Sequence, residues 1–214
     1  MIQFKSPQGG NCILNKTFAR FWKLGVEFSS EVTVKKYLFM YLNLFGIAGI
    51  VVALDQWTKW LVRENIPFAT QWLPDSLQWL MPYARLVYWH NTGAAFGMFQ
   101  NGAPVFTALA FVVIGAILFY YPQIQSEGWL FRLALSLQLA GAVGNLIDRL
   151  TRDGKVTDFI SVGNFPVFNV ADSAITVGTA ILILGVWLNE RQEKQARDET
   201  EAQGNGEQTV LSGE

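Results

Sequence analysis

The stretch "FNVADSAITVGTAILILGVWLN", residues 168–189, decides the fold, because it is long and apolar enough for a membrane helix yet begins with polar residues. After Asp172, no ionisable residue appears until Glu190. About 20 such residues are needed to cross the hydrocarbon core of a bilayer. A carboxylate at the mouth of this helix costs free energy, so the position of Asp172 requires a physical reason.

The composition supports a membrane protein. Of the 214 residues, 51% are hydrophobic and only 15% are charged, and the mean hydropathy is +0.24. These values are unusual for a soluble domain. A net charge of −1 is uninformative about nucleic-acid or acidic partners, and we expect no nucleic-acid partner. One cysteine, Cys12, and one histidine, His90, exclude an internal disulfide and a Cys/His metal site, while a carboxylate-only metal site stays open.

Four apolar runs have the length of a membrane span. They cover residues 37–54, 103–121, 129–147 and 171–189. The second and third runs are separated only by the short turn "PQIQSEG", so we expect these two helices to form an antiparallel pair. The sequence therefore predicts an all-α membrane protein with four transmembrane helices.

The basic residues predict the orientation of these spans. Six of them precede the first span: Lys5, Lys16, Arg20, Lys23, Lys35 and Lys36. Positive charge beside a span stays in the cytoplasm, and four spans return the chain to its starting side. We therefore expect both termini in the cytoplasm, with residues 63–102 and 150–170 on the outer side.

Three segments flank or interrupt the four-span domain, which we place at residues 37–190. Residues 1–36 form an N-terminal extension, which fits a helix lying on the inner leaflet and a disordered leader equally well. Residues 63–102 include "RLVYWHNTGAAFGMF", whose composition favours a small extracytoplasmic β platform at the membrane surface. Residues 191–214 are polar and charged, and we expect a disordered tail.

Polar residues gather at the predicted outer ends of the spans. A charged side chain at the centre of a span costs about 2.5–3.5 kcal/mol on insertion scales, and less toward the ends. The residues lie in the motifs "DQWTKW", "GNLIDR", "VTDFI" and "FNVAD", and they are Asp55, Lys59, Asn145, Asp148, Arg149, Asp158, Asn169 and Asp172. Because every one lies at the same end of its span, a helix bundle can bring them together at one depth.

Each acidic residue also has a purely structural interpretation. Asp55 and Lys59 are spaced for an i,i+4 ion pair, and Asp172 is placed to cap a helix. Asp148 could pair with the adjacent Arg149 or a neighbouring span and only fix the packing. Together, at least four carboxylates exceed what stability requires, because burying charges rarely gains net free energy even when they pair. Three classes of function remain open for these residues: a hydrolytic site, an ion or proton path, and inter-helix contacts in a non-enzymatic assembly subunit. We interpret His90 as a surface or packing residue.

The motifs "DQWTK", "NTGAAFG", "GNLIDR", "VTDFI" and "FNVAD", in this order, resemble those of lipoprotein signal peptidase, also called signal peptidase II. The resemblance covers roughly residues 40–190. It implies a four-span aspartic endopeptidase of the bacterial inner membrane, acting at the outer face. Such an enzyme removes the signal peptide of a prolipoprotein just before a diacylglyceryl-modified cysteine. The resemblance implies no metal and no cofactor, and we expect a monomer whose partners are the lipidated precursor and membrane lipid.

The resemblance also assigns roles to individual residues. It implies that Asp158 and Asp172 are the catalytic pair, supported by Asp55, Lys59, Asn91, Asn145, Asp148, Arg149 and Asn169. The residues alone leave Asp148 open as an alternative to Asp158, although the guanidinium next to Asp148 favours Asp158 as the acid. The interval "FISVGNFPVFNVA" between Asp158 and Asp172 is short for the family, and the N-terminal extension is long. A small proton- or ion-translocating protein with the same carboxylate layer is the alternative function.

Overall fold

The computed structural model describes residues 31–93 and 102–211, and the chain divides into the units Met1–Met40 and Tyr41–Glu214. Of the first unit only the beginning of one helix is described. The predicted character of the N-terminal extension therefore lies outside the described residues, apart from residues 31–36, which are helical.

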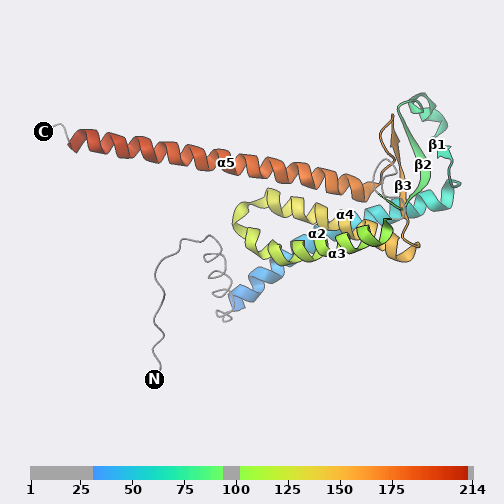
Figure 1. The fold of residues 1–214 in the computed structure, drawn as a ribbon, viewed down its shortest axis with the longest axis horizontal. Coiled ribbons are helices and arrows are strands. Elements are labelled where there is room, and N and C mark those ends of the chain that lie inside the picture. Colours follow the sequence, from blue (N-terminus) through green and yellow to red (C-terminus); the bar gives the residue numbers. More distant parts are fainter. Residues whose placement is uncertain (1–30, 94–101, 212–214) are drawn as a thin grey trace, which may run out of the picture. The chain divides into compact units, whose positions relative to one another are not determined.

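Four long helices carry the fold (Figure 1): α2 (Glu31–Asn65), α3 (Ala103–Tyr120), α4 (Trp129–Thr151) and α5 (Val170–Leu211). The helical stretches that are long and apolar enough to cross a membrane are Tyr37–Asn65, Ala103–Ile124, Trp129–Thr151 and Val170–Gln192, and the second of them continues from α3 into the 3₁₀ helix that follows. A 3₁₀ helix, η3 (Tyr121–Glu127), joins α3 to α4 where we predicted a short turn. Within the described residues, the prediction of four membrane helices is confirmed, and the chain is a multi-pass membrane protein.

Two helices extend further than the sequence predicted. Helix α2 continues beyond residue 54 to Asn65, so that Asp55 and Lys59 lie inside the helix rather than after it. Helix α5 continues to Leu211, so the prediction of disorder does not hold for residues 191–211. That segment is rich in Glu, Gln, Lys, Arg and Ala, which favour helix. Arg191 also lies over the ring of Trp187, 3.9 Å from its centroid, which stabilises the helix where the span ends.

A three-stranded antiparallel sheet accompanies the helices, with strand order β1 (Gln71–Trp72), β2 (Ala84–Asn91), β3 (Val156–Val162). A 3₁₀ helix, η1 (Asp75–Leu80), connects β1 and β2. The predicted platform supplies two of the strands. The third, β3, comes from residues 150–170, in which we did not predict a strand. The register pairs Trp89 with Asp158, and this pairing carries the "VTDFI" motif into the sheet.

The segment after β3 explains the short interval between Asp158 and Asp172. The chain turns at Gly163, whose φ of +51° lies in the region that glycine adopts without strain. It then returns along β3, and Ile160 and Phe168 exchange backbone hydrogen bonds of 2.8 and 3.0 Å. This return brings the start of α5 beside the strand with few residues, so a longer loop is unnecessary.

The sheet is anchored to the end of α2 by a small apolar cluster. Val62 and Ile66, at the end of α2, and Phe159 of β3 are buried together. Partly buried residues of β2, β3 and α5 pack around them, namely Leu86, Tyr88, Ile160 and Val170. The spacing of β3 and α2 is therefore fixed by side-chain packing, which places the Asp158 backbone relative to the helices.

Small residues allow α4 and α5 to approach closely. A Cβ atom built at Gly141 would overlap the backbone oxygen of Ala171 and the side chain of Ile175. A Cβ atom at Gly144 would lie 2.7 Å from Asp55 Oδ2. Without a hydrophobic driving force between helices in lipid, this close packing of small residues is a main source of association.

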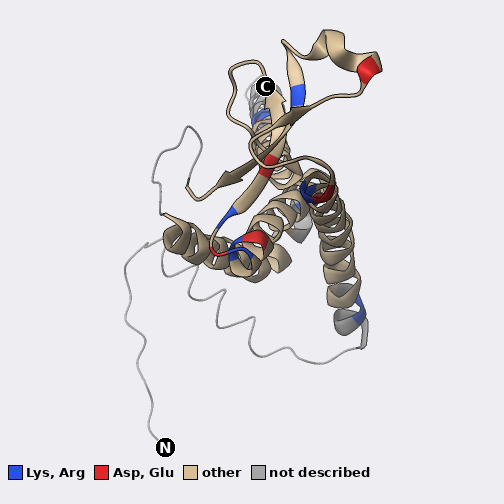
Figure 2. Ribbon diagram, turned by 90° about the vertical axis from the view of Figure 1, so that its right-hand side faces the viewer, with Lys and Arg blue, Asp and Glu red and all other residues tan. Residues whose placement is uncertain are grey.

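Charged residues are sparse along most of the helical ribbons in Figure 2 and gather where the helices meet the sheet. In the described part of α3 there is none, and in α5 none lies between Asp172 and Glu190. The motifs predicted that charged residues gather at one end of the helices. The candidate functional residues therefore lie where the helices meet the sheet.

We predict that Gly141→Ala lowers the thermal unfolding midpoint in detergent micelles. The new methyl group meets a backbone oxygen, which cannot rotate away, so overpacking should cost about 1–3 kcal/mol. The matched control is Gly115→Ala on α3, where nothing lies within 4 Å of the added atom. Equal midpoints for the two variants would show that the contact between α4 and α5 is looser than described.

Candidate functional site

Lys59 occupies the centre of a buried ionic cluster. Its side chain is fully buried, and its Nζ lies 2.8 Å from Asp55 Oδ2 and 3.4 Å from Asp148 Oδ2. The same ammonium donates a hydrogen bond of 3.0 Å to Asn145 Oδ1. A buried charge is tolerated when it is paired and its hydrogen-bonding capacity is used. The i,i+4 ion pair of Asp55 and Lys59 predicted from the sequence is therefore present.

The two aspartates of this cluster also bind backbone N–H groups of other elements, Asp55 by its second oxygen and Asp148 by the same oxygen that faces Lys59. Asp55 Oδ1 accepts a 2.9 Å hydrogen bond from the backbone N–H of Ala171, in the first turn of α5. Asp148 Oδ2 accepts one of 2.9 Å from the backbone N–H of Thr157 in β3. One lysine and its two counterions thus connect α2, α4, α5 and the sheet.

The partner of Asp148 differs from our expectation. We favoured Asp158 as the acid partly because Arg149 is adjacent to Asp148 in sequence. The nearest cation to Asp148 is instead Lys59, and the guanidinium nitrogens of Arg63 and Arg152 follow at 3.9 Å. Adjacent residues of a helix point in different directions, and Arg149 lies over the ring of Phe106, 5.6 Å from its centroid.

The ammonium of Lys59 fixes the orientation of Asn145. Because an ammonium only donates, the atom of Asn145 that faces it must be the amide oxygen. The amide nitrogen of Asn145 therefore points the other way, where it donates a 2.7 Å hydrogen bond to Asp172 Oδ1. Lys59 thus orients the Asn145 amide so that its nitrogen donates a hydrogen bond to Asp172.

Asn169 and Asp172 form a reciprocal cap at the start of α5. The backbone N–H of Asp172 donates to Asn169 Oδ1 at 2.9 Å, and the backbone N–H of Asn169 donates to Asp172 Oδ2 at 3.1 Å. This is the pattern of a capping box, in which two helix-end donors are satisfied together. The capping role that we considered for Asp172 is present, and its carboxylate still reaches the site.

Asp158 is held by two asparagines, Asn169 and Asn91. It is 2% exposed, and its Oδ1 accepts a 2.8 Å hydrogen bond from Asn169 Nδ2, while the side chain of Asn91 hydrogen-bonds the same carboxylate. Asn169 Nδ2 also lies 3.1 Å from Asn145 Oδ1. Burial, and then the nearby carboxylate of Asp172, raise the pKa of Asp158 to about 7. Near neutral pH this carboxyl group can hold or release a proton.

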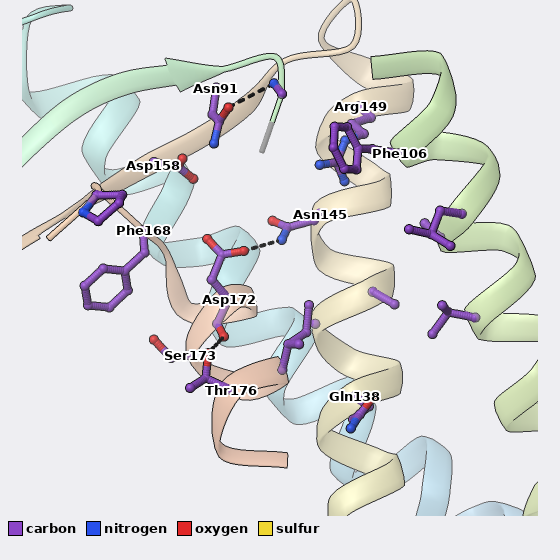
Figure 3. A pocket seen from close by; sticks show the side chains of 18 of the residues that line it. Asn91, Phe106, Gln138, Asn145, Arg149, Asp158, Phe168, Asp172, Ser173 and Thr176 are labelled. Atoms are coloured by element: carbon purple, nitrogen blue, oxygen red, sulfur yellow. Dashed lines mark hydrogen bonds between the residues drawn. The ribbon is translucent and has the colours of Figure 1, made fainter. Parts of the chain in front are cut away.

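Both carboxyl groups line a cavity of about 740 Å³ (Figure 3). Asn91, Asn145 and Arg149 line the same cavity, which continues between α3, α4 and α5 along mostly apolar side chains. Figure 3 shows Asp158 on the side of the sheet and Asp172 on α5, with Asn145 facing them from α4. The arrangement offers two acids of different surroundings, polar groups that can orient a bound chain, and an apolar channel that leads away from them.

The structure brings together all nine site residues that the sequence predicted. Asp158, Asp172, Asn91, Asn145 and Arg149 line the cavity, and the other four form the buried support behind them: Asp55, Lys59, Asp148 and Asn169. His90 does not line this cavity. Its ring lies 4.7 Å from that of Phe68 and its Nε2 lies 2.9 Å from the hydroxyl of Tyr88, in line with a packing role.

Sequence reasoning missed several residues. Gln56 donates to Asp55 Oδ2 at 3.1 Å and to the backbone oxygen of Gly144 at 3.0 Å, and its place inside the motif "DQWTK" was a usable signal. Phe106 and Gln138 also line the cavity, but nothing in their local sequence marks them. In the described ranges, no three His, Cys, Asp or Glu side chains are arranged to hold a metal ion.

We predict that Lys59→Met lowers the free energy of unfolding by about 3–5 kcal/mol, because it removes the ion-pair partner of the buried Asp55 and leaves the buried Asp148 only the more distant guanidinium groups of Arg63 and Arg152. The measurement is denaturant or thermal unfolding in detergent micelles. Lys155→Met, at an exposed position, is the control and should change little. The triple variant Lys59→Met, Asp55→Asn, Asp148→Asn should recover part of the loss. A triple variant no more stable than the single one would contradict the electrostatic explanation.

Comparison with known proteins gives a consistent result. The family model for signal peptidase (SPase) II matches residues 47–188. The lipoprotein signal peptidase of Shouchella clausii is 41% identical over 152 residues, which make up 70% of this chain and 96% of that relative. That of Acinetobacter baylyi is 34% identical over 177 residues, or 77% of this chain and 95% of the relative.

A solved structure of a bacterial membrane enzyme also resembles this chain. The TM-score is 0.61 at 27% sequence identity, and the match covers 69% of this chain and 88% of the other. The fold, the five ordered motifs and these similarities agree with one another. The chain belongs to the signal peptidase II family and is a multi-pass membrane peptidase.

Proposed function

We propose that this protein is an aspartic endopeptidase that removes signal peptides from diacylglyceryl-modified prolipoproteins, with Asp158 and Asp172 as its acid and base. Membership of the signal peptidase II family supports signal-peptide removal from prolipoproteins. The observation that carries the finer proposal is the pair of carboxyl groups that face one cavity and are both hydrogen-bonded by Asn169, while Asn145 donates a further hydrogen bond to Asp172.

We assign the negative charge to Asp172 and the proton to Asp158. Asp172 accepts hydrogen bonds from Asn145 Nδ2 and from the backbone N–H of Asn169, and it lies at the positive end of the α5 dipole. Donors directed at a carboxylate favour its ionised form. Asp158 is more deeply buried and faces that negative charge, which raises its pKa to about 7. Two adjacent acids in different surroundings can then take opposite roles.

In the proposed reaction a water molecule attacks the scissile carbonyl carbon between the two acids. Asp172 removes one proton from this water while Asp158 donates its proton to the carbonyl oxygen, which gives a neutral gem-diol. The gem-diol collapses as the carbon–nitrogen bond breaks. Asp172 then gives its proton to the leaving amine, and Asp158 recovers a proton from the gem-diol hydroxyl. Both acids end in their starting states, so no covalent intermediate is required.

The remaining polar residues of the cavity suit the orientation of a peptide. Asn91 contacts the Asp158 carboxylate, and its Oδ1 accepts a 2.9 Å hydrogen bond from the backbone N–H of Gly93, which fixes its amide. Arg149 lines the cavity with its guanidinium over Phe106. We propose that these two side chains hold the scissile segment, since correct placement of the reacting atoms supplies a large part of catalysis.

We further propose that the site lies at the outer face of the membrane and that both chain termini are cytoplasmic. The support is the basic residues ahead of the first span and the even number of spans. A precursor anchored by its signal helix and by acyl chains would then present its scissile bond at the depth of the two acids. The working expectation is a monomer in contact with membrane lipid and the lipidated precursor.

We predict that Asp158→Asn and Asp172→Asn each abolish cleavage of a lipidated precursor peptide, by about a thousandfold or more, because an amide can neither accept nor donate the required proton. Purified protein in micelles and quantification of released signal peptide provide the measurement. The control is Asp153→Asn, an exposed residue with a φ of +51° that asparagine also tolerates.

The same variants separate the proposed function from its alternatives. If the protein is a non-enzymatic assembly subunit, replacing either acid should lower the amount of the protein in the membrane. If the protein translocates protons or ions, the two variants should lose transport activity in vesicles while precursor cleavage stays normal. Normal cleavage by either variant would end the proposal that these two residues are the acid and base.

We predict that kcat/KM falls as the pH rises through about 7. The acid must be protonated to act, and the pKa of Asp158, raised to about 7, means that its proton is lost above that value. The decline should approach tenfold per pH unit at higher pH. The measurement is a pH–rate profile in micelles from pH 5 to 9. A rate that stays flat or rises from pH 7 to 9 would contradict the assignment of the proton.

A further inference from the structure

We propose that Gln138 is a positioning residue that hydrogen-bonds a peptide group of an unwound, extended segment of the signal peptide inside the apolar part of the cavity. This inference rests on the proposed function, and it concerns how the substrate is held rather than how the bond is cut. It assigns a role to a residue that no motif of the sequence marks.

Gln138 lies in the same cavity as the two acids but well inside the membrane span (Figure 3). It is seven residues before Asn145 on α4, which corresponds to two helical turns, or roughly 10 Å along the axis. It is also close to the middle of the span Trp129–Thr151. A polar side chain at this depth is costly in hydrocarbon, so its presence suggests a function.

The hydrogen-bonding capacity of Gln138 is largely unused. Its Nε2 makes one long hydrogen bond of 3.3 Å to Thr179 Oγ1, whose own hydrogen is donated to the backbone oxygen of Ile175. Its Oε1 has no hydrogen-bond partner among the described residues. A primary amide has two donor hydrogens and two acceptor positions, so Gln138 can offer both a donor and an acceptor. That is the complement of a peptide group.

The other polar residues at this depth are already committed. The hydroxyl of Ser173 donates to the backbone oxygen of Asn169, and that of Thr176 to the backbone oxygen of Asp172, both at 2.9 Å. The surrounding wall is apolar, with Leu109, Ala110 and Val113 on α3 and Ile175 and Val177 on α5. In the described lining below Asn145, Gln138 is thus the side chain that can still donate a hydrogen bond.

The substrate needs such a group if it is to be cut. A signal peptide crosses the membrane as a helix, whose carbonyl oxygens are hydrogen-bonded within the helix and shielded from attack. Unwinding exposes the scissile bond but leaves N–H and C=O groups unpaired in hydrocarbon, which costs several kcal/mol for each group. A helical occupant would have no unpaired peptide group for Gln138 to bind.

The distance indicates which part of the substrate Gln138 reaches. An extended chain advances about 3.3 Å per residue, so a depth of roughly 10 Å corresponds to about three residues. The inference therefore names a peptide group near the third residue before the scissile bond. An acyl chain lying in this part of the cavity is the competing occupant, and it has no hydrogen-bonding group for the amide.

The first test compares Gln138→Leu with Thr179→Val in the full chain, using a lipidated precursor peptide in micelles. We expect kcat/KM of Gln138→Leu to fall roughly fivefold to tenfold, the effect of one lost hydrogen bond. Thr179→Val removes only the internal partner and should leave kcat/KM unchanged or raise it. Unchanged or improved cleavage by Gln138→Leu would overturn the proposal and favour an acyl chain at this position.

The second test locates the peptide group. Precursor peptides with a single ester in place of one amide, at the second to fifth residue before the scissile bond, are cleaved by both enzymes. We expect the unmodified enzyme to lose activity at one position near the third residue, and Gln138→Leu to be insensitive to the ester there alone. Equal ester effects in both enzymes would overturn the proposal, because a merely structural role of Gln138 gives no position dependence.

The two levels of interpretation can fail separately. Full activity of Asp158→Asn would refute the proposed function, whereas inactivity of Asp158→Asn with normal Gln138→Leu would refute only the inference about Gln138. If Gln138→Leu does not fold, judged by its thermal unfolding midpoint, the ester series with the unmodified enzyme decides alone. The absence of any position-specific loss in that series overturns the proposal.

Discussion

The attraction of one buried ammonium for two carboxylates holds the centre of this molecule together. Lys59 lies between Asp55 and Asp148, and each of these aspartates also accepts a hydrogen bond from a backbone N–H of a different element. The start of α5 and strand β3 are thereby tied to the same charge. Because burying an unpaired ion is so unfavourable, these connections cannot loosen one at a time.

The same cluster explains why neighbouring acids can perform different tasks. Asp55 and Asp148 both pair with Lys59, Asp148 also lies 3.9 Å from Arg63 and Arg152, and both aspartates connect elements through backbone hydrogen bonds. Asp158 and Asp172 receive their hydrogen bonds mainly from neutral amides, which leaves them free to exchange protons. Asn145 links the two groups, because its oxygen faces the ammonium and its nitrogen faces Asp172. The Asn145 amide thus lies between the buried ionic cluster, which supports the fold, and the carboxylate that we propose takes part in the reaction.

The sequence predicted the four spans because their apolar length leaves little choice in a bilayer, and it predicted the nine site residues from motifs whose order matches a known family. It did not predict the cation beside Asp148, since Arg149 is adjacent in sequence but points toward Phe106. It also did not reveal that Val156–Val162 joins the sheet, because strand pairing is non-local. Gln138 escaped notice for a related reason: its significance depends on the helices across the cavity, not on its neighbours in the chain.

The reciprocal cap between Asn169 and Asp172 has a consequence for inhibition. The same carboxylate that we propose as the base also completes the first turn of α5, and Asn169 bonds both acids. A substitution that escapes a drug bound to these two side chains would therefore damage folding and turnover together. Resistance should arise instead among the aliphatic residues lining the channel, where bulk can change at little cost. We expect compounds that draw most of their affinity from the capped aspartate to lose potency most slowly under selection.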